Sequence, residues 1–322
     1  MKKLGIFSSG GDAPGMNAAI RAATRSAIFY GCEMIGVNRG YQGMIEGDFT
    51  PLGLRSVSGI INRGGTILKT ARCEEFMAPA GRKKAYEQLK TAGIEGLVAI
   101  GGDGTFRGAH TFTSEFDIPF IGVTGSIDND CYGTDFTLGF DTAVNIALDA
   151  IDRIRDTAAS HDRVFFVEVM GRHSGMIALW SGLAGGAEAI FIPEATEDWD
   201  KITAVIGSGK AKGKTSAIVV VAEGEEQGGA FEVAKRFKER TGLDYRVTIL
   251  GHIQRGGTPT AFDRILGTRS GVKAVEALLA GERNKMVGIQ NGNMVLVPFE
   301  EMFDKRKLPD LSWLKIVEIC SI

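Results

Sequence analysis

Short runs of apolar and β-branched residues recur along the chain, and each run is followed by a polar, glycine-rich turn and then by a stretch with helical periodicity. Residues 4–8 precede the turn SGGD at 9–12, and residues 97–100 precede GGDGT at 101–105. This alternation is typical of parallel β-α-β units. The pattern therefore predicts a doubly wound α/β fold.

Four further apolar runs follow the same order and end in turns with polar side chains. They cover residues 120–123, 164–169, 217–222 and 247–250, and their turns are TGSIDND at 124–130, MGRHSG at 170–175, EG at 223–224 and GHIQRGG at 251–257. Ligands of open α/β sheets bind beyond the carboxyl ends of the strands, so we expect these turns to carry the chemistry. The segment 139–159 has no internal helix breaker and predicts a helix that leads from one domain into the next.

Composition is that of a globular protein. A length of 322 residues is at the upper limit of one hydrophobic core and predicts two domains. Glycine is unusually frequent, since 44 of the 322 residues are glycine, about twice the usual ~7%. Many tight turns would explain this excess. A net charge of -2 argues against nucleic acid or anionic membrane as a partner.

The four cysteines, the apolar runs and the N-terminus indicate where the protein works. The cysteines are scattered, without zinc or disulfide spacing, which favours the reducing cytoplasm. The N-terminus lacks a signal-peptide pattern, and no apolar run approaches the about 18 residues of a membrane helix. We therefore expect a cytoplasmic protein without a membrane span.

Two glycine-rich turns have the composition of phosphate-binding loops. Without a Cβ, the backbone at 10–11 and 101–104 can approach phosphate oxygens, while the following helix offers unpaired N–H groups. A glycine pair alone fits a tight βα turn equally well. Asp103 changes the balance, because a carboxylate beside a phosphate is repelled unless a cation such as Mg²⁺ lies between them.

Carboxylates and arginines gather at the other turns. Asp128 or Asp130 suits a general base, although an Asx turn explains the same spacing. The arginines near strand ends suggest two phosphate sites, although each alone also fits a surface residue; they are Arg72, Arg163, Arg172, Arg246 and Arg255. His252 is interpreted as a binding residue.

Three other patterns are set aside. The GKT at 213–215 lacks the first glycine of a P-loop and leads into a strand, and the glycines at 102, 104 and 108 are one residue too long for a dinucleotide fingerprint. A dehydrogenase is therefore not expected. A separate basic set fits solvated helix faces when judged from the residues alone; it comprises Arg21, Arg25, Arg155, Lys212 and Lys214.

With these motifs in order, the chain resembles the bacterial ATP-dependent 6-phosphofructokinases over essentially its whole length. The matching motifs are SGGDAPGMN at 9–17, GGDG at 101–104, IDND at 127–130, MGR at 170–172 and GHIQRGG at 251–257. The resemblance implies two Rossmann-like lobes with mainly parallel sheets and an active site in the cleft between them. It implies a larger ATP-binding lobe, 1–138 plus 252–301, and a smaller fructose 6-phosphate-binding lobe, 139–251 plus 302–322.

The resemblance also implies a reaction and a set of roles. The terminal phosphoryl group of ATP passes to the C1 hydroxyl of fructose 6-phosphate in glycolysis, with Asp128, Arg72 and Arg172 as catalytic residues and Mg²⁺ at Asp103. The implied ATP contacts are Gly11, Arg72, Cys73, Gly102, Asp103, Gly104 and Thr105. The implied sugar phosphate contacts are Ser126, Ile127, Asp128, Met170, Gly171, Arg172, Glu223, His252, Ile253, Gln254 and Arg255, with Arg163 and Arg246 reaching it from a neighbouring subunit of a homotetramer.

An effector site is implied as well, and it replaces the interpretation of the basic set as solvated helix faces. An ADP-type activator is expected at Arg21, Arg25, Arg155, Gly186, Ala187, Glu188, Lys212 and Lys214. Gly59 stands where the family commonly has Asp, and the pair at 215–216 where it has Lys-His or similar, so we expect a weaker or altered response to the effector.

The phosphoryl donor separates two subclasses of the family. Pyrophosphate-dependent relatives typically carry Asp and Lys at the positions of Gly104 and Gly125, so both glycines favour ATP. The alternatives are a pyrophosphate-dependent phosphofructokinase and a nucleotide-sensing regulatory subunit without catalysis.

Overall fold

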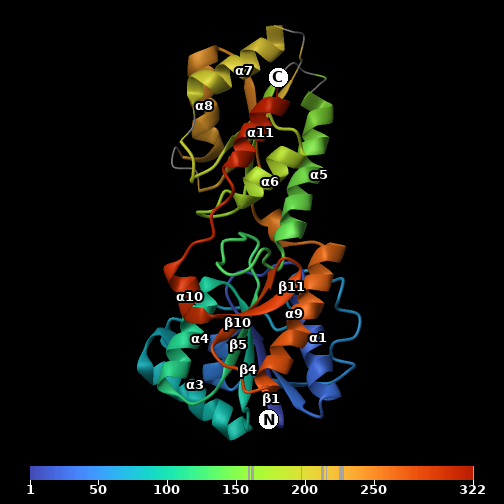
Figure 1. The fold of residues 1–322 in the computed structure, drawn as a ribbon, viewed down its shortest axis with the longest axis vertical. Helices are drawn as coiled ribbons and strands as arrows, with labels where there is room; N and C mark the ends of the chain where they lie inside the picture. Colours follow the sequence, from blue (N-terminus) through green and yellow to red (C-terminus); the bar gives the residue numbers. More distant parts are fainter. Residues whose placement is uncertain are drawn as a thin grey trace. The chain divides into compact units, whose positions relative to one another are not determined.

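The computed structural model describes residues 1–158, 160, 163–196, 198–211, 214, 216–224 and 228–321 (Figure 1). The chain divides into two compact units. Unit 1 contains Met1–Ile127, Cys131–Asp141 and Arg255–Lys307, and unit 2 contains Asp128–Asp130, Thr142–Gln254 and Leu308–Ile322. The assignment of ATP to one lobe and of the sugar phosphate to the other remains a prediction.

Unit 1 is built on a seven-stranded sheet in the order β11-β10-β5-β4-β1-β2-β3. Its strands are β1 (Lys3–Ser8), β2 (Glu33–Val37), β3 (Phe49–Leu52), β4 (Gly96–Gly101), β5 (Phe120–Thr124), β10 (Lys285–Gln290) and β11 (Asn293–Pro298). The strands β2, β1, β4, β5 and β10 run parallel, and β3 and β11 pair antiparallel with the strands beside them. The apolar runs therefore form the centre of a mainly parallel sheet.

Helices cover both faces of this sheet. They are α1 (Met16–Phe29), α2 (Tyr41–Glu46), α3 (Pro79–Ala92), α4 (Asp103–Glu115), α9 (Ala261–Leu279) and α10 (Phe299–Asp304), with a 3-10 turn η1 at Glu75–Met77. Helices α1 and α9 lie side by side on one face, and α3 and α4 lie on the other (Figure 1). Two glycines of α9, Gly267 and Gly271, make this close packing possible, because a Cβ at either would meet the backbone of α1.

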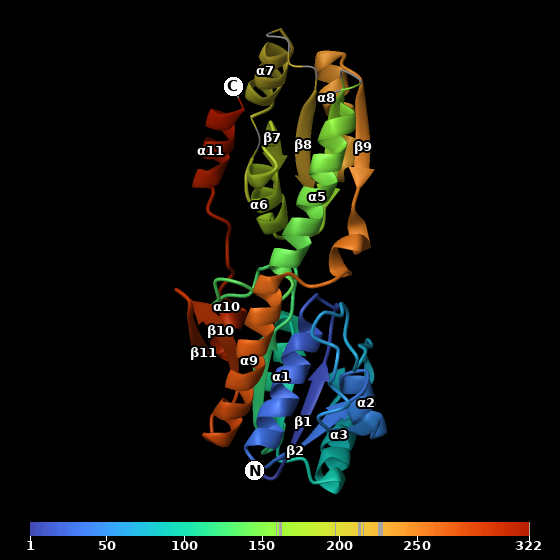
Figure 2. The same ribbon diagram turned by 90° about the vertical axis from the view of Figure 1, so that its right-hand side faces the viewer.

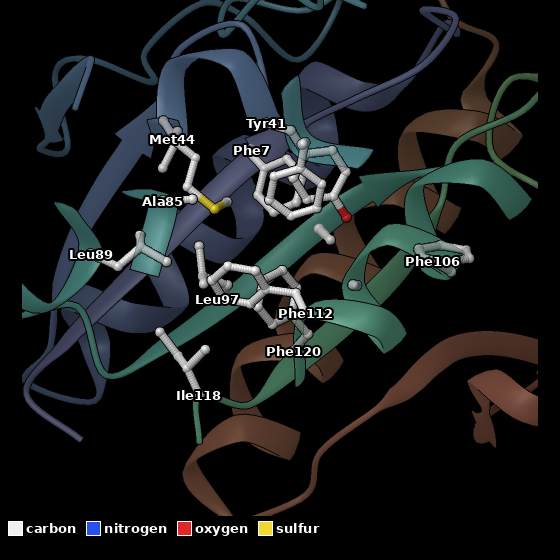
Figure 3. Close-up of a cluster of buried hydrophobic side chains, with 14 of the residues drawn as sticks. Phe7, Tyr41, Met44, Ala85, Leu89, Leu97, Phe106, Phe112, Ile118 and Phe120 are labelled. Atoms are coloured by element: carbon white, nitrogen blue, oxygen red, sulfur yellow. The ribbon is translucent and has the colours of Figure 1, made fainter. Parts of the chain in front are cut away.

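An aromatic core fills the space between the sheet and α2, α3 and α4 (Figure 3). Phe7 of β1 lies 5.0 Å from Tyr41 of α2, and Phe112 of α4 lies 5.6 Å from Phe120 of β5, measured between ring centroids. Alternate strand residues point to this face, as expected for strands with both faces buried. This core fixes the strands whose ends carry the glycine-rich turns.

Unit 2 is built on a four-stranded parallel sheet in the order β7-β8-β6-β9 (Figure 2). Its strands are β6 (Val164–Val169), β7 (Ala189–Phe191), β8 (Ala217–Ala222) and β9 (Tyr245–Ile249). Its helices are α5 (Phe140–Ala158, whose first residues belong to unit 1), α6 (Met176–Ala184), α7 (Trp199–Ala211), α8 (Gly229–Thr241) and α11 (Ser312–Cys320), and a 3-10 turn η2 spans Gly251–Arg255. Helices α7 and α8 share a core with one face of the sheet, and α6 packs on the other.

The α/β class and the mainly parallel sheets are confirmed. Strands β6 and β8 begin and end where the apolar runs predict, and the helix expected at 139–159 is α5. In the part of the chain that the structure describes, no helix combines the length and the apolar character needed to span a membrane.

Candidate active site

Within each unit, the register of neighbouring parallel strands places the turns that follow them at the same level. In unit 1, Ser8 of β1 is level with Ile100 of β4, and Gly101 of β4 is level with Thr124 of β5. In unit 2, Val169 of β6 is level with Ala222 of β8. Each sheet therefore presents its polar turns at one edge, as the strand-end argument predicts.

The turns after β1 and β4 contact each other directly. Ser9 N donates a hydrogen bond to Ile100 O at 3.0 Å, and Thr105 Oγ1 donates one to Ser9 O at 3.2 Å. A Cβ on Gly101 would lie 2.3 Å from Thr105 Oγ1, so only glycine fits between the two turns. The two predicted phosphate loops thus form one continuous backbone surface, with Gly102 and Gly104 in the second loop.

Arg255 reaches this surface from the turn after β9. A Cβ on Gly11 would lie 2.0 Å from Arg255 Nη1, and the same nitrogen donates a hydrogen bond to Asp12 O at 3.4 Å. Two residues that sequence analysis assigned to different ligands, Gly11 and Arg255, therefore lie together in unit 1. A guanidinium at a glycine-rich loop suits a phosphate.

Asp103 is the first residue of α4, and its side chain is half-exposed. Arg107 Nε donates a hydrogen bond to Asp103 Oδ2 at 2.7 Å. Among the described residues, no group of three His, Cys, Asp or Glu side chains is suited to hold a metal ion. Because Mg²⁺ in phosphate-transferring sites uses only one or two carboxylates besides phosphate oxygens and water, a single accessible aspartate fits a nucleotide-borne ion.

The segment with Arg72 and Cys73 leads into η1, which is held by Arg82. Arg82 of α3 is buried and donates hydrogen bonds to Phe76 O at 3.1 Å and to Met77 O at 2.7 Å. Arg72 is exposed, and burial raises the pKa of the Cys73 thiol. Cys73 is therefore a neutral thiol at pH 7, suited to packing and not to nucleophilic attack.

Asp128 and Arg172 come together in unit 2. Arg172 Nε lies 3.9 Å from Asp128 Oδ2, with the carboxylate side chain 7% exposed and the guanidinium side chain 66% exposed. Both turns have a left-handed residue that is not glycine, Asn129 at φ 52° and Arg172 at φ 54°. Such conformations cost energy and cluster at functional sites.

Carboxylate and amide side chains hold the turn at 170–172. Glu223 Oε1 accepts hydrogen bonds from Arg172 N at 2.8 Å and from Gly171 N at 3.4 Å. Gln254 is fully buried, and its Oε1 accepts a hydrogen bond from Met170 N at 2.8 Å. The Gln254 side chain thus supports the turn. Because this side chain is buried, we expect the backbone of Gln254 to make the predicted contact with substrate.

Other predicted substrate residues differ in how accessible they are. Ile127 is buried, so only its backbone is available, whereas Ser126 is half-buried. His252 and Ile253 are exposed in η2.

Arg163 and Arg246 are not brought to these turns within one chain. Arg163 precedes β6, and Arg246 pairs with Phe165 near the start of that strand. The Arg172 turn follows the other end of β6. A strand of six residues is about 20 Å long, beyond the reach of an arginine side chain.

Part of the predicted effector set lies together in unit 2. Lys214 Nζ lies 2.6 Å from the buried Glu188 carboxylate, and Arg155 Nη2 donates to Gly186 O at 2.8 Å, next to the buried Ala187. Arg21 and Arg25 lie one turn apart on α1 of unit 1, and Lys212 lies outside the described residues. The effector site remains a prediction.

Several residues that support the turns were not identified from the sequence. They are Arg82, Arg107, Ser174 and Glu194. Of these four, only Arg107 could have been identified from the sequence, because its spacing of four from Asp103 places both residues on one face of a helix. The partners of the others are distant in the chain.

The fold and the site define an α/β protein built to handle phosphate groups, with a buried carboxylate and an arginine at neighbouring turns. The phosphofructokinase family model matches residues 3–278, and the chain belongs to this family. It is 57% identical to the ATP-dependent 6-phosphofructokinase 1 of Thermus thermophilus and 54% identical to the ATP-dependent 6-phosphofructokinase of Halalkalibacterium halodurans, in each case over all of both chains.

Solved structures give the same result. The phosphofructokinase of Saccharomyces cerevisiae matches with a TM-score of 0.91 and 38% identity over 94% of this chain, which spans 45% of that yeast chain. A pyrophosphate-dependent phosphofructokinase from Marinobacter aquaeolei matches with a TM-score of 0.85 at 22% identity, covering 98% of this chain and 91% of that one, and shows the fold alone.

Proposed function

We propose that this protein transfers the terminal phosphoryl group of ATP to the C1 hydroxyl of fructose 6-phosphate, forming fructose 1,6-bisphosphate and ADP in glycolysis. The observation that carries the proposal is the pairing of buried Asp128 with Arg172. It is supported by end-to-end similarity to proteins named ATP-dependent 6-phosphofructokinase. As in those relatives, the reaction is a phosphotransfer to an alcohol group.

Asp128 acts as the general base in this mechanism. Its carboxylate accepts the proton of the C1 hydroxyl as the oxygen forms a bond to the terminal phosphorus of ATP. The bond from that phosphorus to its bridging oxygen breaks, and ADP leaves with the electron pair. A positioned base of this kind contributes about 10²- to 10⁴-fold in rate.

Arg172 stabilises the charge of the moving phosphoryl group. Its guanidinium carries a permanent charge and is largely exposed, so it is accessible to a ligand while its backbone is held by Glu223. Loss of such an electrostatic contact costs about 10²- to 10³-fold in kcat. Arg72 is the second proposed arginine in this role.

The glycine-rich surface of unit 1 binds the ATP phosphates through backbone N–H groups. Asp103 holds Mg²⁺, which when bound neutralises charge on the nucleotide phosphates. Gly102 and Gly104 lie at the N-terminal end of α4, where the helix dipole favours an anion, while Thr105 N there donates to Gly102 O at 3.0 Å and Thr105 offers its hydroxyl.

The two glycines that favour ATP differ in their surroundings. A Cβ on Gly104 would meet nothing within 4 Å, so the fold leaves this position open for a donor to approach. A Cβ on Gly125 would lie 2.7 Å from Met16 Cε and 3.2 Å from Ile100 Cγ2. A side chain at Gly125 would therefore require the end of the flexible Met16 side chain to move.

The assembly, the effector and the location form part of the proposal. Arg163 and Arg246 serve the sugar phosphate of a neighbouring subunit in a homotetramer, in keeping with their distance from the turns of their own chain. An ADP-type activator binds with an altered response because Gly59 lacks a carboxylate. Strong activation by ADP in a fructose 6-phosphate titration would contradict the altered response. The protein acts in the cytoplasm.

Product formation tests the function. Purified protein with Mg²⁺ and fructose 6-phosphate is supplied with ATP or with pyrophosphate, and fructose 1,6-bisphosphate is measured. We expect product with ATP alone. Product only with pyrophosphate would favour the other subclass, and no product with either would favour a regulatory subunit.

A further inference from the structure

Ser174 is a buried residue that contacts both turns of the proposed catalytic pair. Its Oγ donates a hydrogen bond to Asp128 O at 2.9 Å, and the residue is 4% exposed. Its backbone N donates to Gly171 O at 2.9 Å and thereby closes the turn that contains Arg172. One residue thus joins the peptide of the proposed base to the turn of the proposed arginine.

We propose that Ser174 is a positioning residue for phosphoryl transfer, one that holds Asp128 in register with Arg172. This inference rests on the proposed function, because it assigns Ser174 a role in the same reaction. Ser174 is 46 residues from Asp128 in the chain, and the hydrogen bond is buried.

The backbone at Asp128 needs such a support. The carbonyl that Ser174 binds belongs to the peptide before Asn129, whose φ of 52° is left-handed. This conformation is uncommon outside glycine, although asparagine tolerates it better than most residues. Rotation about the Cα–C bond of Asp128 changes the orientation of its side chain relative to the turn that follows, so a hydrogen bond to the Asp128 carbonyl restrains the proposed base.

The turn that carries Ser174 is itself firmly held. Gly175 N donates to both carboxylate oxygens of Glu194, at 2.9 and 3.1 Å. A Cβ on Gly171 would lie 2.2 Å from Ser174 O, so the turn closes tightly on itself. Ser174 therefore restrains Asp128 from a fixed point, because its own position is set by the turn and by Glu194.

Ser181 offers a matched control in α6, the helix that follows the turn of Ser174. It is fully buried, and its Oγ donates to Ile177 O at 2.7 Å, one helical turn away. Ser181→Ala removes a buried serine hydroxyl from a position close in sequence, and that hydroxyl bonds within the helix and to neither turn. Ser174→Thr keeps an Oγ and serves as the rescue variant.

The experiment measures kcat, the KM for each substrate and thermal unfolding for the wild type, Ser174→Ala, Ser174→Thr and Ser181→Ala. Ser174 Oγ also accepts a long hydrogen bond from Met176 N at 3.4 Å, and we expect Ser174→Ala to lower kcat by about 5- to 10-fold because the bond that holds the proposed base in place is lost. The KM for ATP should stay within about twofold, Ser181→Ala should keep the wild-type kcat, and Ser174→Thr should recover most of it. A folded Ser174→Ala protein with wild-type kcat would overturn the inference.

A double-mutant cycle with Asp128→Asn separates positioning from general support of the fold. If Ser174 acts through Asp128, Ser174→Ala should lower kcat by less than about twofold when Asp128 is already replaced. An equal loss in both backgrounds would overturn the inference. An inactive wild-type protein would reject the proposed function and this inference together, whereas active wild type with an unaffected Ser174→Ala rejects the inference alone.

Discussion

Arg107 pairs with Asp103 across one turn of α4, with 2.7 Å between Arg107 Nε and Asp103 Oδ2. Arg107 is also anchored on α10, because its Nη2 donates to Phe303 O at 3.2 Å and its guanidinium carbon lies 4.5 Å from the centroid of the Phe303 ring. Arg107 therefore orients the Asp103 carboxylate that is proposed to bind Mg²⁺. The same guanidinium places a positive charge close to the proposed ion.

The two members of this pair should affect the Mg²⁺ requirement differently. Asp103→Asn removes the charge that attracts the ion, and we expect the Mg²⁺ concentration for half-maximal activity to rise by about tenfold or more. Arg107→Gln removes a competing cation, and we expect that concentration to stay constant or fall by about twofold. A titration of activity with Mg²⁺ at saturating ATP measures both.

Asp149 and Arg153 form a matched control pair on α5, also four residues apart and exposed. Asp149→Asn and Arg153→Gln should leave the Mg²⁺ titration unchanged. A normal Mg²⁺ requirement in Asp103→Asn would remove Asp103 from the metal site.

Replacement of Asp128 tests the proposed base. Asp128→Asn keeps the size of the side chain but cannot accept the proton, so kcat should fall by about 10²- to 10⁴-fold while the KM for ATP changes little. Steady-state kinetics measure both constants. Near-normal turnover would exclude Asp128 from proton transfer.

Gly104 should show opposite effects on stability and activity. It lies in the first turn of α4, and a Cβ there has open space, so Gly104→Ala should raise the free energy of unfolding by up to about 1 kcal/mol. The same methyl group would crowd the ATP phosphates, and we expect kcat/KM for ATP to fall by about tenfold. Urea unfolding and steady-state kinetics test the two effects separately.

Gly207 of α7 is the matched control, since its Cβ position is equally open. Gly207→Ala should raise stability without lowering activity. Unchanged kinetics in Gly104→Ala would mean that the phosphates do not approach this backbone.

Local sequence patterns were sufficient for the strand–turn–helix order but not for the contacts that support the turns. Strands β6 and β8 match their apolar runs residue for residue, because parallel strands with both faces covered are mostly apolar, with Glu168 of β6 the one charged residue of the two strands. The bond between Ser174 and Asp128 joins segments 46 residues apart, and no spacing rule reports it. Side-chain contacts of this kind depend on tertiary packing, which a motif does not encode.

Glycines illustrate the same limit. In the sequence, Gly104 and Gly125 both favoured ATP as the phosphoryl donor. In the structure, the two glycines have different surroundings. Gly125 is enclosed by Met16 and Ile100, whereas Gly104 is open. A glycine in a sequence shows that a side chain is absent but not which neighbour excludes it.

The ion pair of Arg82 with Glu115 should make stability depend on pH. Arg82 Nε donates to Glu115 Oε2 at 2.7 Å, and this bond holds the pKa of Glu115 below its ordinary value of about 4.3. Since the folded state has the lowered pKa, the pair's stabilisation is fully present above the ordinary pKa and is lost as pH falls through the lowered one. The contribution of this ion pair to the free energy of unfolding is therefore lost in acid.

Glu115→Gln should reveal this dependence. The substitution removes the charged partner of a buried guanidinium, and we expect it to lower the free energy of unfolding by about 1 to 3 kcal/mol at pH 7. The difference from the wild type should persist down to about pH 5 and shrink below about 4.3, as Glu115 of the wild type becomes protonated. Urea unfolding across this range measures it. Glu75→Gln is the control, because it disrupts the exposed pair with Lys84, and it should lower the free energy of unfolding by less than about 1 kcal/mol. If the loss of stability in Glu115→Gln stayed constant to the lowest pH, the charge of Glu115 would not be its source.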